Sequence, residues 1–479
     1  MIILYLLIAV LVILAAVVIG RTVKFKAPAG EKKETQSVEY DSDKAVSNLQ
    51  ALVRCRTVSY YDHSLEDNAE FDKLIGLLPE LYPNFWKTCP LTKFDGRGLL
   101  FKWEGKKHDE ASVMMAHYDV VPVNESGWTK PPFDALIDEN GIMWGRGTLD
   151  TKNTFNASLT AADHLIAKGF VPEHDVYFAY SGGEEINGEG AVNIVNWFSE
   201  QGIRPALVLD EGGAVVQDVF PGVKRPCGMV GIAEKGMMNV KFTAKSAGGH
   251  ASAPKPGSPL VRLSRAAVKL EEHPFKYHMT KPAAEMFNTL GRHSSFLYRM
   301  IFANFWLFGG LFDMICKKGG GTINALMRTT VALTQSKGSS APNVIPPEAE
   351  MIANLRLNPE DSIASAKEYL RKVIDDDSIS IEVGDSMEPS PISETDCEAW
   401  NKVAESVSET WDGCIVSPYL MVQCSDSRHY KDISNHVYKF SVADMTAEQL
   451  ESIHGNDEHI SVSTVRKASE FYIRLLSRC

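Results

Sequence analysis

Acidic and histidine side chains recur in this sequence at the ends of short apolar runs and in one glycine-bracketed loop. In chain order the set is His117, Asp119, Asp150, Glu184, Glu185 and Asp210. Imidazole and carboxylate groups suit divalent zinc, manganese or cobalt. A lone histidine at a strand end is more often structural, but four separate segments deliver such groups here. The set therefore predicts a metal site.

Three predicted strands, 111–117, 175–181 and 205–213, must bring these side chains together. Predicted helices at 154–169 and 190–202 alternate with them, and this alternation is typical of an α/β sheet. Ligands of open α/β sheets bind outside the carboxyl ends of the strands. We therefore expect the set to converge at one edge of the sheet.

The adjacent glutamates, Glu184 and Glu185, require different roles because neighbouring side chains diverge in any regular backbone. Gly182 and Gly183 precede them and permit a tight turn. One glutamate can face a metal while the other faces a water molecule. By the same alternation, Asp119 can follow His117 to one side of the chain and accept its second ring N–H.

The pattern of predicted elements changes near residue 232. From there the predicted strands and helices follow the order βαββαβ, which suggests a small ferredoxin-like domain. Its predicted strands are 236–246, 328–336, 349–359 and 378–386, and its predicted helices are 258–273 and 361–374. We predict four parts of the chain: a membrane anchor at 1–26, the α/β catalytic domain at 27–231 and 388–479, and an inserted lid or dimerisation domain at 232–387.

The stretch 2–20 is apolar except for Tyr5 and reaches about 28 Å as a helix, enough to cross one bilayer core. It lacks the basic start of a secretory signal, so a single-span anchor is the favoured interpretation. Arg21, Lys24 and Lys26 follow it, and the positive-inside rule places the soluble part in the cytoplasm. Residues 27–40 are predicted to form a polar tether.

A second apolar stretch, 296–315, carries Arg299, Asn304 and Asp313, which argue against another span. Two interpretations stay open. It forms a helical hairpin packed on the lid domain, or it supplies an apolar wall for a greasy substrate or a membrane contact.

The composition excludes some classes of function. The formal net charge of -12 disfavours a nucleic-acid partner. Eight scattered cysteines without a CxxC pair indicate free thiols rather than a disulfide framework or a cysteine–zinc site.

The sequence resembles the dizinc aminoacylase, acetylornithine deacetylase and carboxypeptidase family, peptidase family M20. The subgroup it is most similar to holds carboxypeptidase S and the N-acyl amino acid hydrolases. From about residue 41 onward, the motifs are "AHYDVVPV", "GRGTLDTKN", "SGGEEINGEGA", "LDEGG", "AGGHASAP", "NVIPPEAEMIANLR" and "IHGNDEHIS".

The resemblance implies two divalent ions, zinc first, with cobalt or manganese as alternatives. It assigns His117 and Asp210 to one ion, Glu185 and His454 to the other, and Asp150 as a bridge. It makes Glu184 the general base and Asp119 the support of His117. These assignments give a charge of zero, since +4 from the metals is offset by three carboxylates and a bridging hydroxide.

The resemblance also implies roles in the inserted domain. His250 would polarise the substrate carbonyl, in relatives often across a dimer interface, so a homodimer is expected as an option. Asn343 and Arg356 would bind the substrate carboxylate. A cis peptide bond is implied after Asp150.

Some positions depart from the pattern or leave it ambiguous. Gln423 and Cys424 stand where relatives carry a glycine-rich turn, which bears on pocket shape. Asp426 and Arg428 could line the pocket. Glu211 could compete with Asp210 as the ligand, although the strand-end position favours Asp210.

Together these features predict a membrane-anchored dizinc hydrolase that cleaves an amide next to a free carboxylate, in a peptide or an N-acyl amino acid. Two alternatives are a non-catalytic, membrane-tethered binding protein of the same fold and a synthase that runs the reverse reaction.

Overall fold

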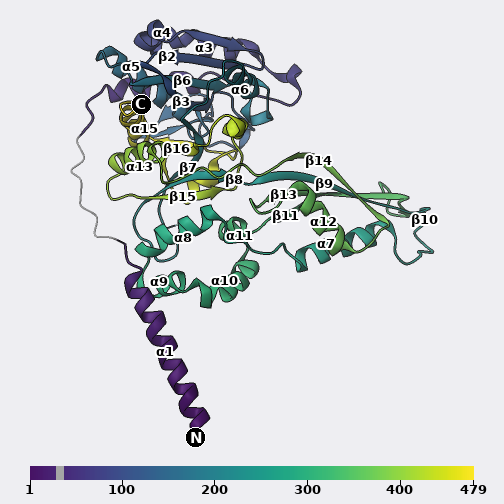
Figure 1. Cartoon of the computed structure of the whole chain (residues 1–479). Coiled ribbons are helices and arrows are strands. Elements are labelled where there is room, and N and C mark those ends of the chain that lie inside the picture. The colour runs from purple at the N-terminus through teal and green to yellow at the C-terminus, as the bar shows by residue number, and fades with distance from the viewer. Residues whose placement is uncertain (28–36, 219) are drawn as a thin grey trace.

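The computed structural model describes residues 1–27, 37–218 and 220–479, and its largest element is a mixed eight-stranded sheet (Figure 1). The strands lie in the order β1 (Leu91–Phe94), β2 (Gly98–Trp103), β6 (His174–Ser181), β3 (Lys107–His117), β7 (Leu207–Val216), β16 (Val437–Met445), β8 (Cys227–Glu234) and β15 (Ile415–Met421). β6, β3, β7 and β16 are parallel, as are β8 and β15. The predicted α/β class is confirmed.

Both faces of this sheet are covered, because successive strand residues point to opposite sides. Met114 and Ala116 of β3 face a core that includes α5 (Lys152–Ala167), α13 (Glu398–Thr410) and α15 (Val462–Leu476). α2 (Ser42–Val53), α3 (Asn68–Leu81) and α4 (Pro83–Thr88) extend the same core. Val113 and Met115 face α6 (Gly190–Glu200) and the turn η4 (Asp426–Asp432).

A second, antiparallel sheet has the order β11 (Thr330–Lys337), β13 (Glu348–Leu357), β9 (Gly236–Lys245) and β14 (Ile379–Met387). α7 (Pro259–Glu272) and α12 (Ile363–Ile374) pack on it. This order matches the predicted βαββαβ outline. The chain leaves the large sheet at Glu234 and enters the second sheet at Gly236. Between them, the buried Lys235 donates to the carbonyls of Ala325 and Arg328, both at 2.8 Å.

Between β9 and β11, four further helices follow α7: α8 (Lys281–His293), α9 (Phe296–Ala303), α10 (Phe305–Gly319) and α11 (Gly321–Met327). They contain the apolar stretch 296–315. Phe287 and Phe302 belong to a cluster that includes Ile415 and Leu420 of β15. The expectation that this stretch packs on the lid domain is therefore corrected, since its buried side chains join the core of the large sheet.

The amino-terminal helix α1 (Ile2–Lys24) projects from the body beside α9 (Figure 1). Among the described residues it is the one unbroken helix long and apolar enough to cross a membrane, and most of it is exposed. The predicted tether at 27–40 falls largely outside the described residues, at 28–36.

Two small sheets and a few turns complete the fold. β4 (Leu136–Ile137) and β17 (His459–Ser461) flank β5 (Ile142–Trp144), while β10 (Gly249–His250) pairs with β12 (Val344–Ile345). η3 (Glu184–Ile186) follows β6, and α14 (Ala447–Ser452) precedes β17. The β17–β5 pairing brings the carboxyl-terminal segment against the loop that carries Asp150.

The close approach of β7 and β8 depends on Gly213. A Cβ added there would lie 1.7 Å from the carbonyl oxygen of Met229. We expect Gly213→Ala to lower the free energy of unfolding by about 2 kcal/mol, because the strand must move to admit the methyl group. Thermal unfolding of the purified chain checks this.

Gly76→Ala is the matched control, since a Cβ on this exposed residue of α3 meets no atom within 4 Å. It should raise the stability by up to about 1 kcal/mol through helix propensity. Equal midpoints for the two variants would show that the β7–β8 contact is looser than described.

Candidate metal centre

The first group of possible ligands forms where β3 and β7 meet the loop before α5. His117 Nε2 lies 2.9 Å from Asp150 Oδ1 and 3.2 Å from Glu211 Oε1. The imidazole is buried, and the pKa of His117 is raised because the surrounding carboxylates outweigh the cost of burial. Burial also raises the pKa of Glu211, to about 8. These three atoms lie close enough together to share one cation.

The second group shares Asp150 with the first. His454 Nε2 lies 3.0 Å from Asp150 Oδ2 and 3.0 Å from Glu185 Oε2. Hydrogen bonds to these carboxylates raise the pKa of His454 to about 10, while burial raises that of Glu185 to about 6. Asp150 thus presents one carboxylate oxygen to each group.

Glu211, and not Asp210, is the β7 carboxylate that approaches His117, which corrects the sequence-based expectation. Asp210 Oδ2 instead accepts a hydrogen bond from the backbone N–H of Ser427 at 2.8 Å. Its Oδ1 accepts one from the N–H of Glu211 at 2.9 Å. Because adjacent strand residues face opposite sides, the two cannot both face the site. Asp210 joins η4 to β7.

Asp119 connects His117 with the turn that carries the two glutamates. Its backbone carbonyl lies 3.0 Å from His117 Nδ1, closer than its carboxylate at 3.4 Å. The carboxylate oxygens accept hydrogen bonds from the N–H groups of Glu184 and Glu185, at 3.2 and 3.3 Å. Asp119 therefore fixes both the orientation of the His117 ring and the position of the first residues of η3.

Glu184 occupies a half-buried position beside the first group, and burial raises its pKa well above the usual range. The negative charges of Asp426, Glu211 and Glu185 add to this shift, and His117 opposes it. A carboxylate of raised pKa holds a proton more readily than an exposed glutamate does. Glu184 and Glu185 thus meet different surroundings, although they are neighbours in the chain.

Glu458 organises the Asp150 loop, and the sequence analysis missed it. Its buried Oε1 accepts hydrogen bonds from the N–H groups of Gly147, Leu149 and Asp150, at 3.0, 2.7 and 3.2 Å. Its Oε2 pairs with Arg146 at 2.7 Å. A signal was present, because Glu458 lies four residues after His454 in "HGNDE". The bond between Asp150 and Thr151 is cis, as predicted.

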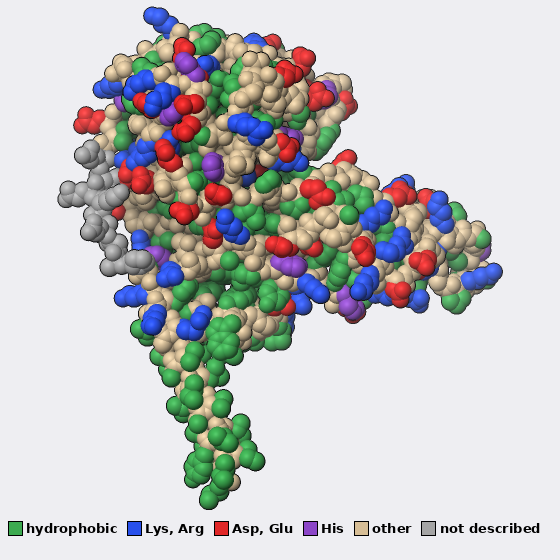
Figure 2. All heavy atoms as spheres, in the orientation of Figure 1, with side chains coloured by type: hydrophobic (Ala, Val, Ile, Leu, Met, Phe, Trp, Pro, Cys, Tyr) green, Lys and Arg blue, Asp and Glu red, His purple; other side chains and the backbone are tan. Residues whose placement is uncertain are grey.

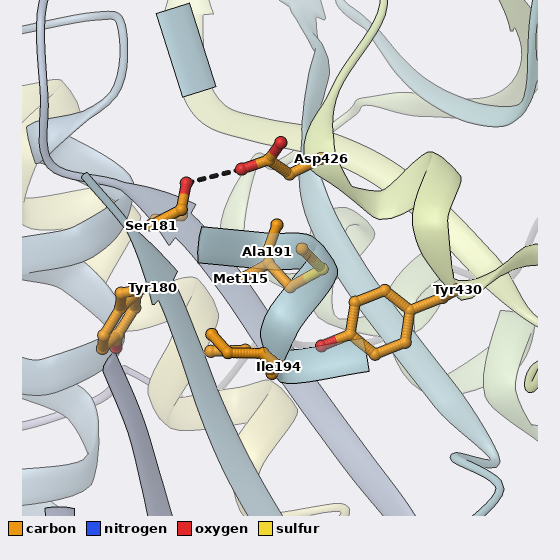
Figure 3. A pocket seen from close by; sticks show the side chains of 9 residues that line it. Met115, Tyr180, Ser181, Ala191, Ile194, Asp426 and Tyr430 are labelled. Carbon is orange, nitrogen blue, oxygen red and sulfur yellow. Dashed lines mark hydrogen bonds between the residues drawn. The ribbon is translucent and has the colours of Figure 1, made fainter. Parts of the chain in front are cut away.

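A small apolar pocket lies behind the centre, between β3, β6, α6 and η4 (Figure 3). Ser181 donates a hydrogen bond of 2.5 Å to Asp426 Oδ2 across its mouth. Burial raises the pKa of Asp426 to about 6. Met115 of β3 and Ala191 and Ile194 of α6 also line the pocket.

The donor set fits a pair of divalent cations. Each group combines one imidazole with two carboxylates, which is a common ligand set for zinc. The buried Glu185 Oε1 has no hydrogen-bond partner among the described residues, and a cation would satisfy it. A divalent ion would take the place of protons at these groups, because histidine and carboxylate ligands must be deprotonated to bind a metal.

Of the three residues expected to contact substrate, His250 and Asn343 lie far from this centre, and Arg356 lies closer to it. His250 of β10 lies next to Asn343, which precedes the paired strand β12, and the N–H of Ala251 donates to the Asn343 carbonyl at 3.0 Å. β10 lies at the tip of the second sheet that is farthest from the large sheet (Figure 1). Arg356 lies near the end of β13 and contacts Cys424 Sγ through Nη1 at 3.4 Å. The single chain therefore does not bring His250 and Asn343 to the ligand groups.

Comparisons with known proteins assign this chain to a protein family. The sequence pattern described as "Peptidase family M20/M25/M40" matches residues 113–478. The chain is 31% identical to the "Probable carboxypeptidase S-like 2" of Dictyostelium discoideum, over 95% of this chain and 90% of that protein. It is 32% identical to the "N-fatty-acyl-amino acid synthase/hydrolase PM20D1" of Xenopus tropicalis, over 97% and 93%.

A solved structure shows the same fold. The M20 family metallo-carboxypeptidase Sso-CP2 from Sulfolobus solfataricus superimposes with a TM-score of 0.66. The match covers 90% of this chain and 98% of that chain, at 17% identity.

The choice between Glu211 and Asp210 gives a direct test. We expect Glu211→Gln to bind one cation fewer than the unaltered chain, because it removes a charged ligand from the His117 group. Asp210→Asn should keep the full metal stoichiometry, since it alters only contacts to backbone N–H groups. Titration with zinc, followed by elemental analysis, measures both. Loss of a cation in Asp210→Asn alone would restore the original assignment.

Proposed function

Because this chain belongs to peptidase family M20/M25/M40, we propose that it is a hydrolase that uses two divalent cations to cleave an amide next to a free carboxylate. The observation that carries this proposal is the sharing of Asp150 by two ligand groups. One carboxylate oxygen serves each group, so Asp150 would contribute a ligand atom to each of two cations.

Specific residues would hold each cation, with zinc first and cobalt or manganese as alternatives. His117, Asp150 and Glu211 would bind one, and Asp150, Glu185 and His454 the other. Bound there, the cations would supply positive charge that polarises a carbonyl group and acidifies a water molecule.

Glu184 would act as the general base. Its carboxylate would accept a proton from the attacking water molecule and then donate it to the leaving amine. Its position suits this double role, because Glu184 lies beside the first ligand group and belongs to neither group. Asp119 would hold Glu184 in place through the backbone of η3.

The second sheet would bind the substrate and act as a lid. Arg356 lies on the part of that sheet next to the centre, where a guanidinium can pair with a substrate carboxylate. His250 and Asn343 sit at the distant tip, so we propose that a second copy of the chain brings them to the site. This makes the active form a homodimer.

The names of the relatives indicate two classes of substrate, and both classes carry an amide next to a free carboxylate. A carboxypeptidase cleaves a peptide bond beside a free carboxylate, and an N-acyl amino acid carries an amide beside one. We propose both as substrate classes, with hydrolysis as the reaction. The same residues serve synthesis from a free acid and an amine, because a catalyst lowers the barrier in both directions.

α1 would anchor the enzyme as a single membrane span. Its length and apolar character satisfy the requirement for crossing a bilayer. Arg21, Lys24 and Lys26 follow the apolar run, so by the positive-inside rule the catalytic part would lie in the cytoplasm.

Glu184 and Glu185 have separate proposed roles, proton transfer and cation binding, and substitution can distinguish them. We expect Glu184→Gln to keep both cations but to lose about 100-fold or more in kcat, because the proton carrier is gone. Glu185→Gln should lose cation affinity by about tenfold or more, and high metal concentration should partly restore its turnover. Release of amino acid from N-acyl amino acids and dipeptides, together with metal content, measures both. Near-normal turnover of Glu184→Gln would overturn the mechanism.

A mixing experiment tests whether His250 acts across a dimer. His250→Ala and Glu184→Gln chains, each nearly inactive alone, are expressed together with different tags. Random pairing should then recover about a quarter of normal activity, since half of the pairs are mixed and each mixed pair has one complete site.

The control mixes Glu184→Gln with Glu185→Gln. Both residues belong to one chain's centre, so this mixture should stay inactive. If the His250→Ala mixture also stays inactive while the tags show mixed dimers, His250 does not act from the partner.

A further inference from the structure

Helix α10 is apolar on both its inner and its outer side. Phe305 and Phe312 face inward and contact the Phe287 ring of α8, with ring centres 5.8 and 5.6 Å apart. The outer side carries Leu307, Leu311, Met314 and Ile315, each between 41% and 60% exposed. A helix that is apolar all round is normally buried on all sides. Within the described chain, protein covers only the inner side.

Helix α9 continues this exposed apolar surface. Phe296 and Leu297 are 51% and 62% exposed, and Trp306 follows at 59% just beyond the bend. The two helices turn by 107° at Asn304. We call residues Phe296–Gly319 the α9–α10 platform. Single exposed apolar side chains are ordinary, but a contiguous set of this size marks a contact surface.

The amino-terminal helix is fixed to this platform by buried polar contacts. Asn304 Nδ2 donates to the Val18 carbonyl and to Thr22 Oγ1, both at 3.2 Å. Arg21 Nε donates to the Ala303 carbonyl at 3.1 Å. Thr22 and Asn304 are fully buried. A helix without a constant position would not bury an asparagine against its backbone.

The height of this contact along α1 is informative. Val18 and Thr22 lie about 24 and 30 Å from Ile2 along the helix axis, at 1.5 Å per residue. The hydrocarbon core of a bilayer is about 30 Å thick. If α1 crosses the membrane, the platform therefore lies at the level where the hydrocarbon ends and the headgroups begin.

Basic side chains surround the same level. They come from α1 and the segment after it, from the end of α8 and from the platform: Arg21, Lys24, Lys26, Arg292, Arg299, Lys317 and Lys318. Figure 2 shows blue side chains gathered where the green α1 joins the body. The chain as a whole is acidic, so this local positive charge favours an anionic lipid surface.

We propose that the α9–α10 platform lies in the headgroup region of the bilayer that α1 spans, with the outer side of α10 in contact with lipid. The platform is not a second span, because Asp313 pairs with the buried Arg328, which follows α11, and this pair keeps α10 attached to the body. The proposal rests on the anchor proposed above. The anchor and the platform together fix the height and tilt of the enzyme on the membrane.

Site-directed fluorescence on the full chain tests this proposal. Leu311→Cys and, as a second position, Ile315→Cys are labelled with an environment-sensitive fluorophore. The labelled chains are reconstituted into vesicles of phosphatidylcholine and phosphatidylserine. Leu65→Cys is the matched control, because Leu65 is 62% exposed and precedes α3, which lies at the opposite end of the molecule from α1 (Figure 1). Since the native cysteines are buried or half-buried, the unsubstituted chain gives the background.

We expect the emission from positions 311 and 315 to shift to shorter wavelength and to be quenched by lipid spin-labelled near its headgroup. The emission from position 65 should stay as in water. Alkaline carbonate extraction of the same vesicles tests the anchor separately. A chain that resists extraction but shows no shift at 311 or 315 would overturn the platform and leave the anchor intact. A chain released by carbonate would overturn the anchor, and the platform with it.

Discussion

The Asp150 carboxylate lies between two histidines from opposite ends of the catalytic sequence, and the rest of the centre is arranged around it. One oxygen faces His117 and the other faces His454. The loop that presents Asp150 is held by the buried Glu458, which accepts three backbone N–H groups and is paired with Arg146. Since Glu458 follows His454 by only four residues, one short segment supplies a ligand and also positions the shared carboxylate.

This arrangement concentrates negative charge where there is little water. Glu184, Glu185, Glu211 and Asp426 all have raised pKa values because burial disfavours their ionised forms. Such a group of acids is unstable unless cations or protons offset it. The proposed cations would provide that compensation. Asp119 and Asp210 accept hydrogen bonds from backbone N–H groups that would otherwise be unsatisfied.

Much of this centre could be predicted from the sequence, because its residues stand at the ends of apolar runs and topology brings strand ends together. His117, Asp150, Glu185 and His454 meet as the motifs indicated. The choice between Asp210 and Glu211 could not be predicted, because it depends on which face of β7 each side chain occupies. The β7–β16 register shifts next to Asp210, and such an irregularity has no clear sequence signal. Glu458 was missed for a related reason: its partners are backbone N–H groups, which leave no pattern in side-chain types.

The long-range packing of the apolar helices was also beyond the sequence. Residues 296–315 are rich in aromatic side chains, and this pattern would be the same whichever sheet they packed on. Only the folded chain shows that Phe287 and Phe302 cluster with residues of β15. Asn304 is an isolated polar residue in the sequence, and its contact with Val18 and Thr22 depends on the position of α1. Pairings between residues so far apart in the chain are set by the whole fold rather than by local preference.

Anomalous X-ray scattering at the zinc absorption edge, from crystals of the zinc-loaded protein, would locate the cations relative to Asp150. We expect two separate peaks, one on either side of the Asp150 carboxylate. One should lie next to His117 and Glu211, and the other next to Glu185 and His454. A single peak, or a peak bound by Asp210 while Glu211 points away, would contradict it.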